Sequence, residues 1–164
     1  GAGLGGSGVM SPATSPAMSA AMSPVMSPAM SPVMSPAGGS VFEELKAMID
    51  GIDDKRRVGV CLDTMHTFAA GFDIRTRDGF LRTMEHFDKT VGMKYLRGLH
   101  LNDSKVGLNA HVDRHESLGA GLLGMEVFKC IMTDNRFENM PLVLEPPNEE
   151  LWAQEIRQLR ELAG

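Results

Sequence analysis

The chain has 164 residues, which suggests one domain, but residues 1–39 are almost entirely Gly, Ala, Ser, Pro, Val and Met, so only about 125 residues can form a core. All charged side chains lie after residue 40, and the formal net charge of −5 argues against non-specific affinity for nucleic acid. No apolar stretch approaches the roughly 20 residues that span a bilayer, so no membrane association is predicted.

The first part of the chain is a low-complexity segment. Residues 10–36 repeat a Met-Ser-Pro-(Ala/Val) unit, and proline at this density removes the amide donors that helices and central strands need. With too little apolar surface to offset the entropy of ordering, residues 1–39 are predicted to be disordered with polyproline character. The segment is interpreted as an insertion, with phosphorylation of its Ser-Pro pairs as the alternative.

From residue 40 onward, apolar residues alternate between helical and strand spacing. A capping box of Ser40 and Glu43 predicts the start of the first helix. The expected elements in chain order are a helix at 40–52, a strand at 57–63, a helix at 77–91, a strand at 95–101, a helix at 125–132, a strand at 141–145 and a helix at 151–162. A long polar loop follows the second strand, and the last helix is expected to bury Ile156. This alternation predicts an α/β fold with a parallel sheet covered by helices.

The two cysteines, Cys61 and Cys130, lie inside apolar runs. They are interpreted as buried, reduced thiols of an intracellular protein. The compartment is expected to be the nucleus or mitochondrion of a eukaryote or the cytoplasm of a bacterium.

Each predicted strand carries a polar residue at or next to its last position. Asp63, His100 and Glu145 share one parity, opposite to that of Val60 and Leu62 in the first strand. In a (β/α) barrel this parity points inward and opens at the carboxyl-terminal mouth of the strands, where such barrels carry their chemistry. The three side chains are therefore expected to converge there.

Two short motifs, Asp63-x-x-His66 and Asp113-x-His115, each pair a carboxylate with an imidazole. Taken singly, an aspartate after a strand often caps the next helix, and a histidine in a loop is usually a surface residue. Taken together they predict a metal site. The candidate ligands are Asp63, His66, His100, Asp113, His115 and Glu145. Oxygen and nitrogen ligands without a thiolate suit zinc, manganese or magnesium, and the imidazoles favour zinc.

Four segments in order resemble signatures of the endonuclease IV family of apurinic/apyrimidinic endonucleases. They are VGVCLDTMHTFAAG at 58–71, YLRGLHLNDSK at 95–105, VDRH at 112–115 and LVLEP at 142–146. The resemblance implies a TIM barrel that holds up to three zinc ions. It also implies that His66, Asp113 and His115 bind one ion, while Asp63, His100 and Glu145 help to hold a second.

The resemblance further implies an activity, the hydrolysis of the phosphodiester 5′ to an abasic site in double-stranded DNA during base excision repair, by an enzyme that is a monomer in its complete form. Glu145 is the candidate for orienting or deprotonating the attacking water. Side chains in or beside loops at the same mouth are candidate DNA contacts: Arg75, Arg77, Asn102, Lys105 and Arg114. Gly119 and Gly121 are expected to permit a turn that no side chain would fit.

A complete barrel has eight strands and about 250 residues, whereas only three strands are predicted here. Residues 40–164 are therefore expected to form the C-terminal portion of a (β/α)8 barrel and to be inactive alone, because the family pattern requires two further histidines and a bridging glutamate. Residues 1–8 resemble the glycine-rich stretch that follows this glutamate, which would make the repeat a loop insertion on the active-site face. The alternatives are a sugar isomerase of the same barrel superfamily and a non-catalytic remnant that binds partners through the Ser-Pro segment.

Overall fold

The computed structural model describes residues 25–26 and 41–164. Its elements are β1 (Val25–Met26), α1 (Val41–Asp50), β2 (Gly59–Asp63), α2 (Thr64–Ala69), α3 (Arg77–Thr90), β3 (Leu96–Leu101), β4 (Asp103–Ser104), β5 (His115–Glu116), α4 (Met125–Met132), β6 (Leu142–Leu144) and α5 (Trp152–Ala163), with short 3-10 turns between some of them. Every predicted helix and strand is present, and the observed ends lie within one or two residues of the predicted ones. The capping box at Ser40 lies outside the described residues.

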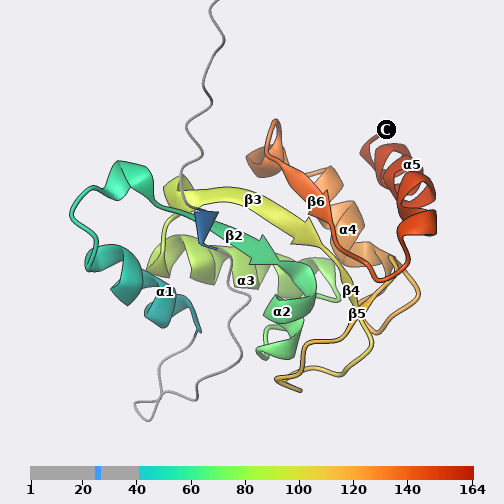
Figure 1. Cartoon of the computed structure of the whole chain (residues 1–164), viewed down its shortest axis with the longest axis horizontal. Coiled ribbons are helices and arrows are strands. Elements are labelled where there is room, and N and C mark those ends of the chain that lie inside the picture. The colour runs from blue at the N-terminus through green and yellow to red at the C-terminus, as the bar shows by residue number, and fades with distance from the viewer. Residues whose placement is uncertain (1–24, 27–40) are drawn as a thin grey trace, which may run out of the picture.

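The main sheet has the strand order β1-β2-β3-β6, and all of its pairs are parallel. Asp63 at the end of β2 is in register with His100 of β3, and His100 is in register with Val143 of β6. The carboxyl ends of these strands therefore lie side by side. Helix α2 and the small β4–β5 hairpin lie beyond the carboxyl ends of β2 and β3 (Figure 1).

The hydrophobic core lies between this sheet and the helices that follow its strands. Helix α3 packs between α1 and α4 along one side of the sheet (Figure 1). One phenylalanine from each of these helices is almost completely buried, namely Phe42, Phe87 and Phe128. Each such side chain contributes roughly 1.5–3 kcal/mol through the apolar surface that it removes from water. The core thus supports the sheet whose carboxyl-terminal edge carries the candidate site.

Most of the segment predicted to be disordered lies outside the described residues. Val25 and Met26 are the exception, because they form β1 and pair with Gly59 and Val60. Neither is a proline, so both keep the amide donor that a strand requires. For the rest of residues 1–39, disorder stays a prediction.

The helix α5 corrects one prediction about the core. Ile156 is 42% exposed, whereas Glu155 beside it is 3% exposed. The Glu155 carboxylate accepts a hydrogen bond from the Leu118 amide at 2.9 Å, and this bond turns the acidic side chain inward. A polar contact with a distant loop has overridden the apolar pattern of the helix.

The polar loop after β3 is also more ordered than its sequence predicts. Asp103 and Ser104 pair with Glu116 and His115 as an antiparallel hairpin. The hairpin brings His115 back to the carboxyl-terminal edge of the sheet. None of the helices in the part of the chain that the structure describes is both long and apolar enough to cross a membrane.

We expect neither cysteine of the native chain to react rapidly with an alkylating reagent at about pH 8. Both are buried free thiols, as predicted. Burial, together with the negative charges of Asp63 and Glu145, raises the pKa of Cys61 to about 11, so only about one Cys61 in 1,000 carries a thiolate at that pH. Burial also raises the pKa of Cys130.

Labelling with iodoacetamide followed by mass spectrometry measures this protection. The unfolded chain in denaturant is the control, and both thiols should react there at the rate of a free cysteine. Rapid labelling of Cys61 in the native chain would contradict its place in the core.

Candidate metal centre

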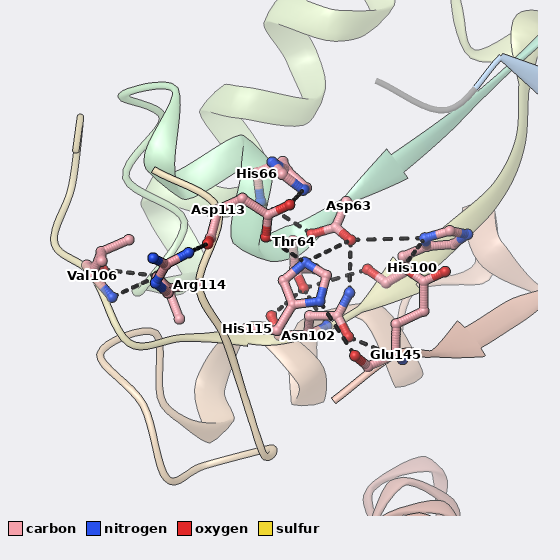
Figure 2. Close-up of polar contacts among 11 residues, drawn as sticks. Asp63, Thr64, His66, His100, Asn102, Val106, Asp113, Arg114, His115 and Glu145 are labelled. Atoms are coloured by element: carbon pink, nitrogen blue, oxygen red, sulfur yellow. Dashed lines mark hydrogen bonds and ion pairs between the residues drawn. The ribbon is translucent and has the colours of Figure 1, made fainter. Parts of the chain in front are cut away.

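The first group of candidate ligands lies across the ends of three adjacent strands. Asp63 ends β2, His100 lies near the end of β3, and Glu145 directly follows β6. His100 Nδ1 is 2.8 Å from Glu145 Oε2 and 3.7 Å from Asp63 Oδ2 (Figure 2). One ligand atom from each residue lies within 4.8 Å of the other two, a spacing that a single cation can bridge. We call these residues the strand-end group.

The second group consists of Asp63, His66 and His115, whose ligand atoms also lie within 4.8 Å of one another. Asp113 borders it, because its carboxylate oxygens are 3.6 Å from His66 Nε2 and 3.5 Å from His115 Nε2 (Figure 2). The side chain of Asp113 is 66% exposed, so the group is open to solvent on that side. We call these four residues the loop group. It shares Asp63 with the strand-end group.

Local structure explains why His66 faces the site. Asp63 is the N-cap of α2, and its Oδ1 accepts a hydrogen bond from the His66 amide at 3.0 Å. The cap places His66 on the first turn of the helix, above the end of β2. The interpretation of Asp63 as a helix cap and its interpretation as a ligand are therefore both supported, since Oδ2 remains directed at the histidines.

Asp63 is only 2% exposed. Burial raises the pKa of its carboxyl group. The rise is opposed by the hydrogen bond from the His66 backbone amide, by the electrostatic influence of the neighbouring His66 and His115 rings, and by the hydrogen bond from the Asn102 side chain. A buried carboxylate is stable in its charged form only when a cation or strong donors compensate it. Asp63 already accepts hydrogen bonds from the His66 amide and the Asn102 side chain, and its buried carboxylate is also compatible with a bound cation.

His115 provides a direct test of whether the residues fit a metal. Its Nε2 atom is buried and has no hydrogen-bond partner within the described part of the chain. Its other ring nitrogen, Nδ1, lies 3.2 Å from the carbonyl oxygen of Glu145. A histidine ligand commonly donates one ring N–H to a carbonyl and presents the other nitrogen to the metal. The orphaned Nε2, directed at Asp63 and Asp113, fits that arrangement, and the mixture of imidazoles and carboxylates suits zinc.

Asn102 occupies a different place from the one predicted. It is fully buried, so it cannot contact DNA as expected. Its Nδ2 donates to Asp63 Oδ2 at 2.6 Å, and its Oδ1 accepts from the Glu145 amide at 3.0 Å. The side chain thus connects two candidate ligands, Asp63 and Glu145, through hydrogen bonds.

The other candidate DNA contacts lie at the surface. The Arg75 guanidinium group forms two hydrogen bonds to Asp73, at 2.9 and 2.8 Å, and the pKa of Asp73 is lowered to about 2, chiefly by these bonds. Lys105 lies 3.9 Å from Glu116, and Arg114 donates to the carbonyl of Asp113 at 2.8 Å. Arg77, the first residue of α3, is exposed. These cations border the site or its neighbouring loops, and their role as DNA contacts stays a prediction.

Asp103 was missed by the sequence analysis. It is fully buried and accepts hydrogen bonds from five backbone amides. These belong to Ser104, Gly119, Gly121, Leu123 and Gly124, at distances of 2.7–3.3 Å.

The glycines at 119, 121 and 124 were the available signal for this arrangement. A Cβ on Gly121 would lie 2.5 Å from Asp103 Oδ1, and Gly119 has a positive φ of 77°. The expected turn is therefore present, and it is stabilised by hydrogen bonds from its backbone amides to the buried carboxylate of Asp103. This turn lies a few residues after His115, so the hydrogen bonds to Asp103 hold the chain in place where it leaves the loop group.

Comparisons with known proteins agree with this architecture. Residues 32–162 match the family model of the xylose isomerase-like TIM barrel. Endonuclease IV from Thermus thermophilus is similar with a TM-score of 0.62 and 30% identity, over 74% of this chain and 43% of that one. The structure of AsfvAP:AG is similar in fold, with a TM-score of 0.58 and 22% identity, over 74% of this chain and 46% of that one.

This chain thus spans less than half of each of these two structures. The predicted likeness to endonuclease IV and the predicted fold, part of a TIM barrel, are both confirmed. With the family model covering most of its length, the chain belongs to the xylose isomerase-like TIM barrel family.

Proposed function

We propose that this chain supplies part of the metal centre of a zinc-dependent phosphodiesterase, which acts as a monomer in base excision repair and cuts double-stranded DNA 5′ to abasic sites. The observation that carries the proposal is the pair of ligand groups joined through buried Asp63 at the carboxyl ends of the strands. The similarity to endonuclease IV supports the choice of substrate. The site of action is then a compartment that contains DNA.

The family resemblance implies a role for each residue, and the positions of the two groups support these roles. The loop group would hold one zinc ion through His66, Asp113 and His115, and the strand-end group would help to hold a second through Asp63, His100 and Glu145. The family pattern implies a third ion, for which the described residues form no further group of ligands. Zinc bound there would supply Lewis acidity, which lowers the pKa of water and offsets the charge of the phosphate.

Glu145 is the candidate catalytic residue. Its side chain is 46% exposed, and its Oε2 is held 2.8 Å from His100. It is therefore both anchored and accessible to solvent at the carboxyl ends of the strands. A carboxylate in this position can orient the attacking water and accept its proton.

Arg75, Lys105 and Arg114 would meet the DNA backbone. The chain carries a net charge of −5, so attraction to phosphate must come from local cations of this kind. Each lies in a loop on the side of the strand ends and is paired with a carboxylate or a carbonyl. Phosphates can compete for these partners when DNA binds.

A chimera tests the proposal. The part of Thermus thermophilus endonuclease IV that this chain does not cover would be joined to residues 41–164, and its fold checked by circular dichroism and gel filtration. With zinc, we expect a single cut 5′ to an abasic-site analogue in a duplex oligonucleotide, and no cut by the Glu145→Gln variant. A folded chimera that binds zinc but leaves the oligonucleotide intact would contradict the proposal.

Two further assays separate the alternatives. Cleavage by the 164-residue chain itself would show that its own ligands suffice. Isomerisation of an aldose by the chimera, without cleavage of abasic DNA, would instead favour the sugar isomerase interpretation.

A further inference from the structure

Asn102 lies at the point where the ends of β2, β3 and β6 meet. It directly follows β3, and its backbone is fixed to the start of α2 by the Thr64 hydroxyl. That hydroxyl accepts from the Asn102 amide at 2.9 Å and donates to the Asn102 carbonyl at 2.6 Å. The residue is fully buried, so its side chain has a single environment and no contact with solvent.

Both polar ends of the Asn102 side chain are used, and they cannot be exchanged. The Nδ2 group donates to Asp63 Oδ2, which is the oxygen directed at the histidines. The Oδ1 atom accepts from the Glu145 amide, which is a donor only. From the position directly after β3, the amide thus supplies a donor to the last residue of β2 and an acceptor to the residue after β6.

The influence of Asn102 extends to His115 through the backbone of Glu145. Asn102 holds the Glu145 amide, and the carbonyl of Glu145 lies 3.2 Å from His115 Nδ1. With Nδ1 donating to this carbonyl, the orphaned Nε2 is the nitrogen left for a metal. Asn102 therefore bonds directly to Asp63, the candidate ligand common to both groups. Through the Glu145 backbone it also acts on Glu145 in the strand-end group and on His115 in the loop group.

We propose that Asn102 is a positioning residue that couples the two ligand groups, so that loss of its side-chain amide weakens zinc binding at both groups together. The inference rests on the metal-binding part of the proposed function and not on the substrate. It predicts a pattern that a ligand of one group alone does not give, because Asp113 serves only the loop group and His100 only the strand-end group.

The test is a titration of the full 164-residue chain with zinc in competition with a chromophoric chelator. We expect Asn102→Ala to bind zinc about 10–100-fold more weakly at both groups, which is the range for residues that support metal ligands. Asp113→Asn and His100→Gln are the matched controls, and each should weaken one group and spare the other. Cobalt(II) in place of zinc gives a second readout, since its visible spectrum should change in Asn102→Ala at both steps of the titration.

Asn102→Leu is the variant of similar volume, and it serves if the alanine variant does not fold. Folding is judged by protection of Cys61 and Cys130 from alkylation. In the unaltered chain, the side-chain amide resonances of Asn102 should shift on addition of each zinc equivalent.

A folded variant with unchanged zinc affinity would overturn the inference, as would weakening at one group only, or an Asn102 resonance that does not respond to zinc. Failure of the unaltered chain to bind zinc would overturn it as well. If the unaltered chain binds zinc at both groups and the chimera does not cut abasic DNA, the substrate proposal fails and the inference on Asn102 stands.

Discussion

Replacing Asp103 by asparagine is expected to lower the free energy of unfolding by about 3–5 kcal/mol. The carboxylate accepts five backbone amides, three of them at Oδ2. In Asp103→Asn, one acceptor oxygen becomes an NH2 group that faces backbone donors. At least two partly or fully buried N–H groups then remain without a partner, and each costs about 1–3 kcal/mol. Urea denaturation followed by circular dichroism measures the change.

Asp53→Asn is the control for Asp103→Asn, because it makes the same chemical change at an exposed aspartate. It should alter the free energy of unfolding by no more than about 0.5 kcal/mol. If Asp103→Asn cost as little as this control, the amides of residues 119–124 would have other partners, and the carboxylate would not organise the turn.

Replacing Asp63 by alanine is expected to remove zinc from both groups at once. Asp63 is the residue that the two groups have in common, and it is buried between them. Removal of a residue that merely supports ligands weakens metal binding by about 10–100-fold, so loss of a shared ligand should exceed about 100-fold at each group. The zinc content of the purified chain at a buffered free zinc concentration measures the effect.

His115→Ala is the comparison for Asp63→Ala. It removes a ligand of the loop group alone, so zinc at the strand-end group should persist. Asp53→Ala should change neither group. Retention of zinc at either group in a folded Asp63→Ala chain would show that the two groups do not share this carboxylate.

The sequence predicted the fold and the placement of most candidate ligands because both depend on short periodic patterns. Strand parity alone placed Asp63, His100 and Glu145 on one side of the sheet, and the parallel register brings them together. His66 could be predicted from its position three residues after Asp63, on the first turn of a helix. The sequence therefore allowed us to predict where the candidate ligands lie when they belong to a regular element or directly follow one.

The remaining features depend on tertiary contacts, which no periodic pattern in the sequence indicates. Asn102 looked like a polar loop residue and is instead buried, because the start of α2 and the residue after β6 both bond to it. Asp103 was overlooked because its five donors come from residues up to 21 positions away. Glu155 took the buried place expected for Ile156 because it bonds to the Leu118 amide.

The double role of Asp63 affects how sequences of related proteins can be interpreted. The same carboxylate caps α2 and faces the histidines, so selection for a stable helix would preserve an aspartate there even in a lineage that has lost its metal. The Nε2 atom of His115 has no comparable structural role, because it has no hydrogen-bond partner among the described residues. Where selection for metal binding is absent, drift at His115 should therefore precede drift at Asp63, which makes the histidine the more informative marker of metal binding among related sequences.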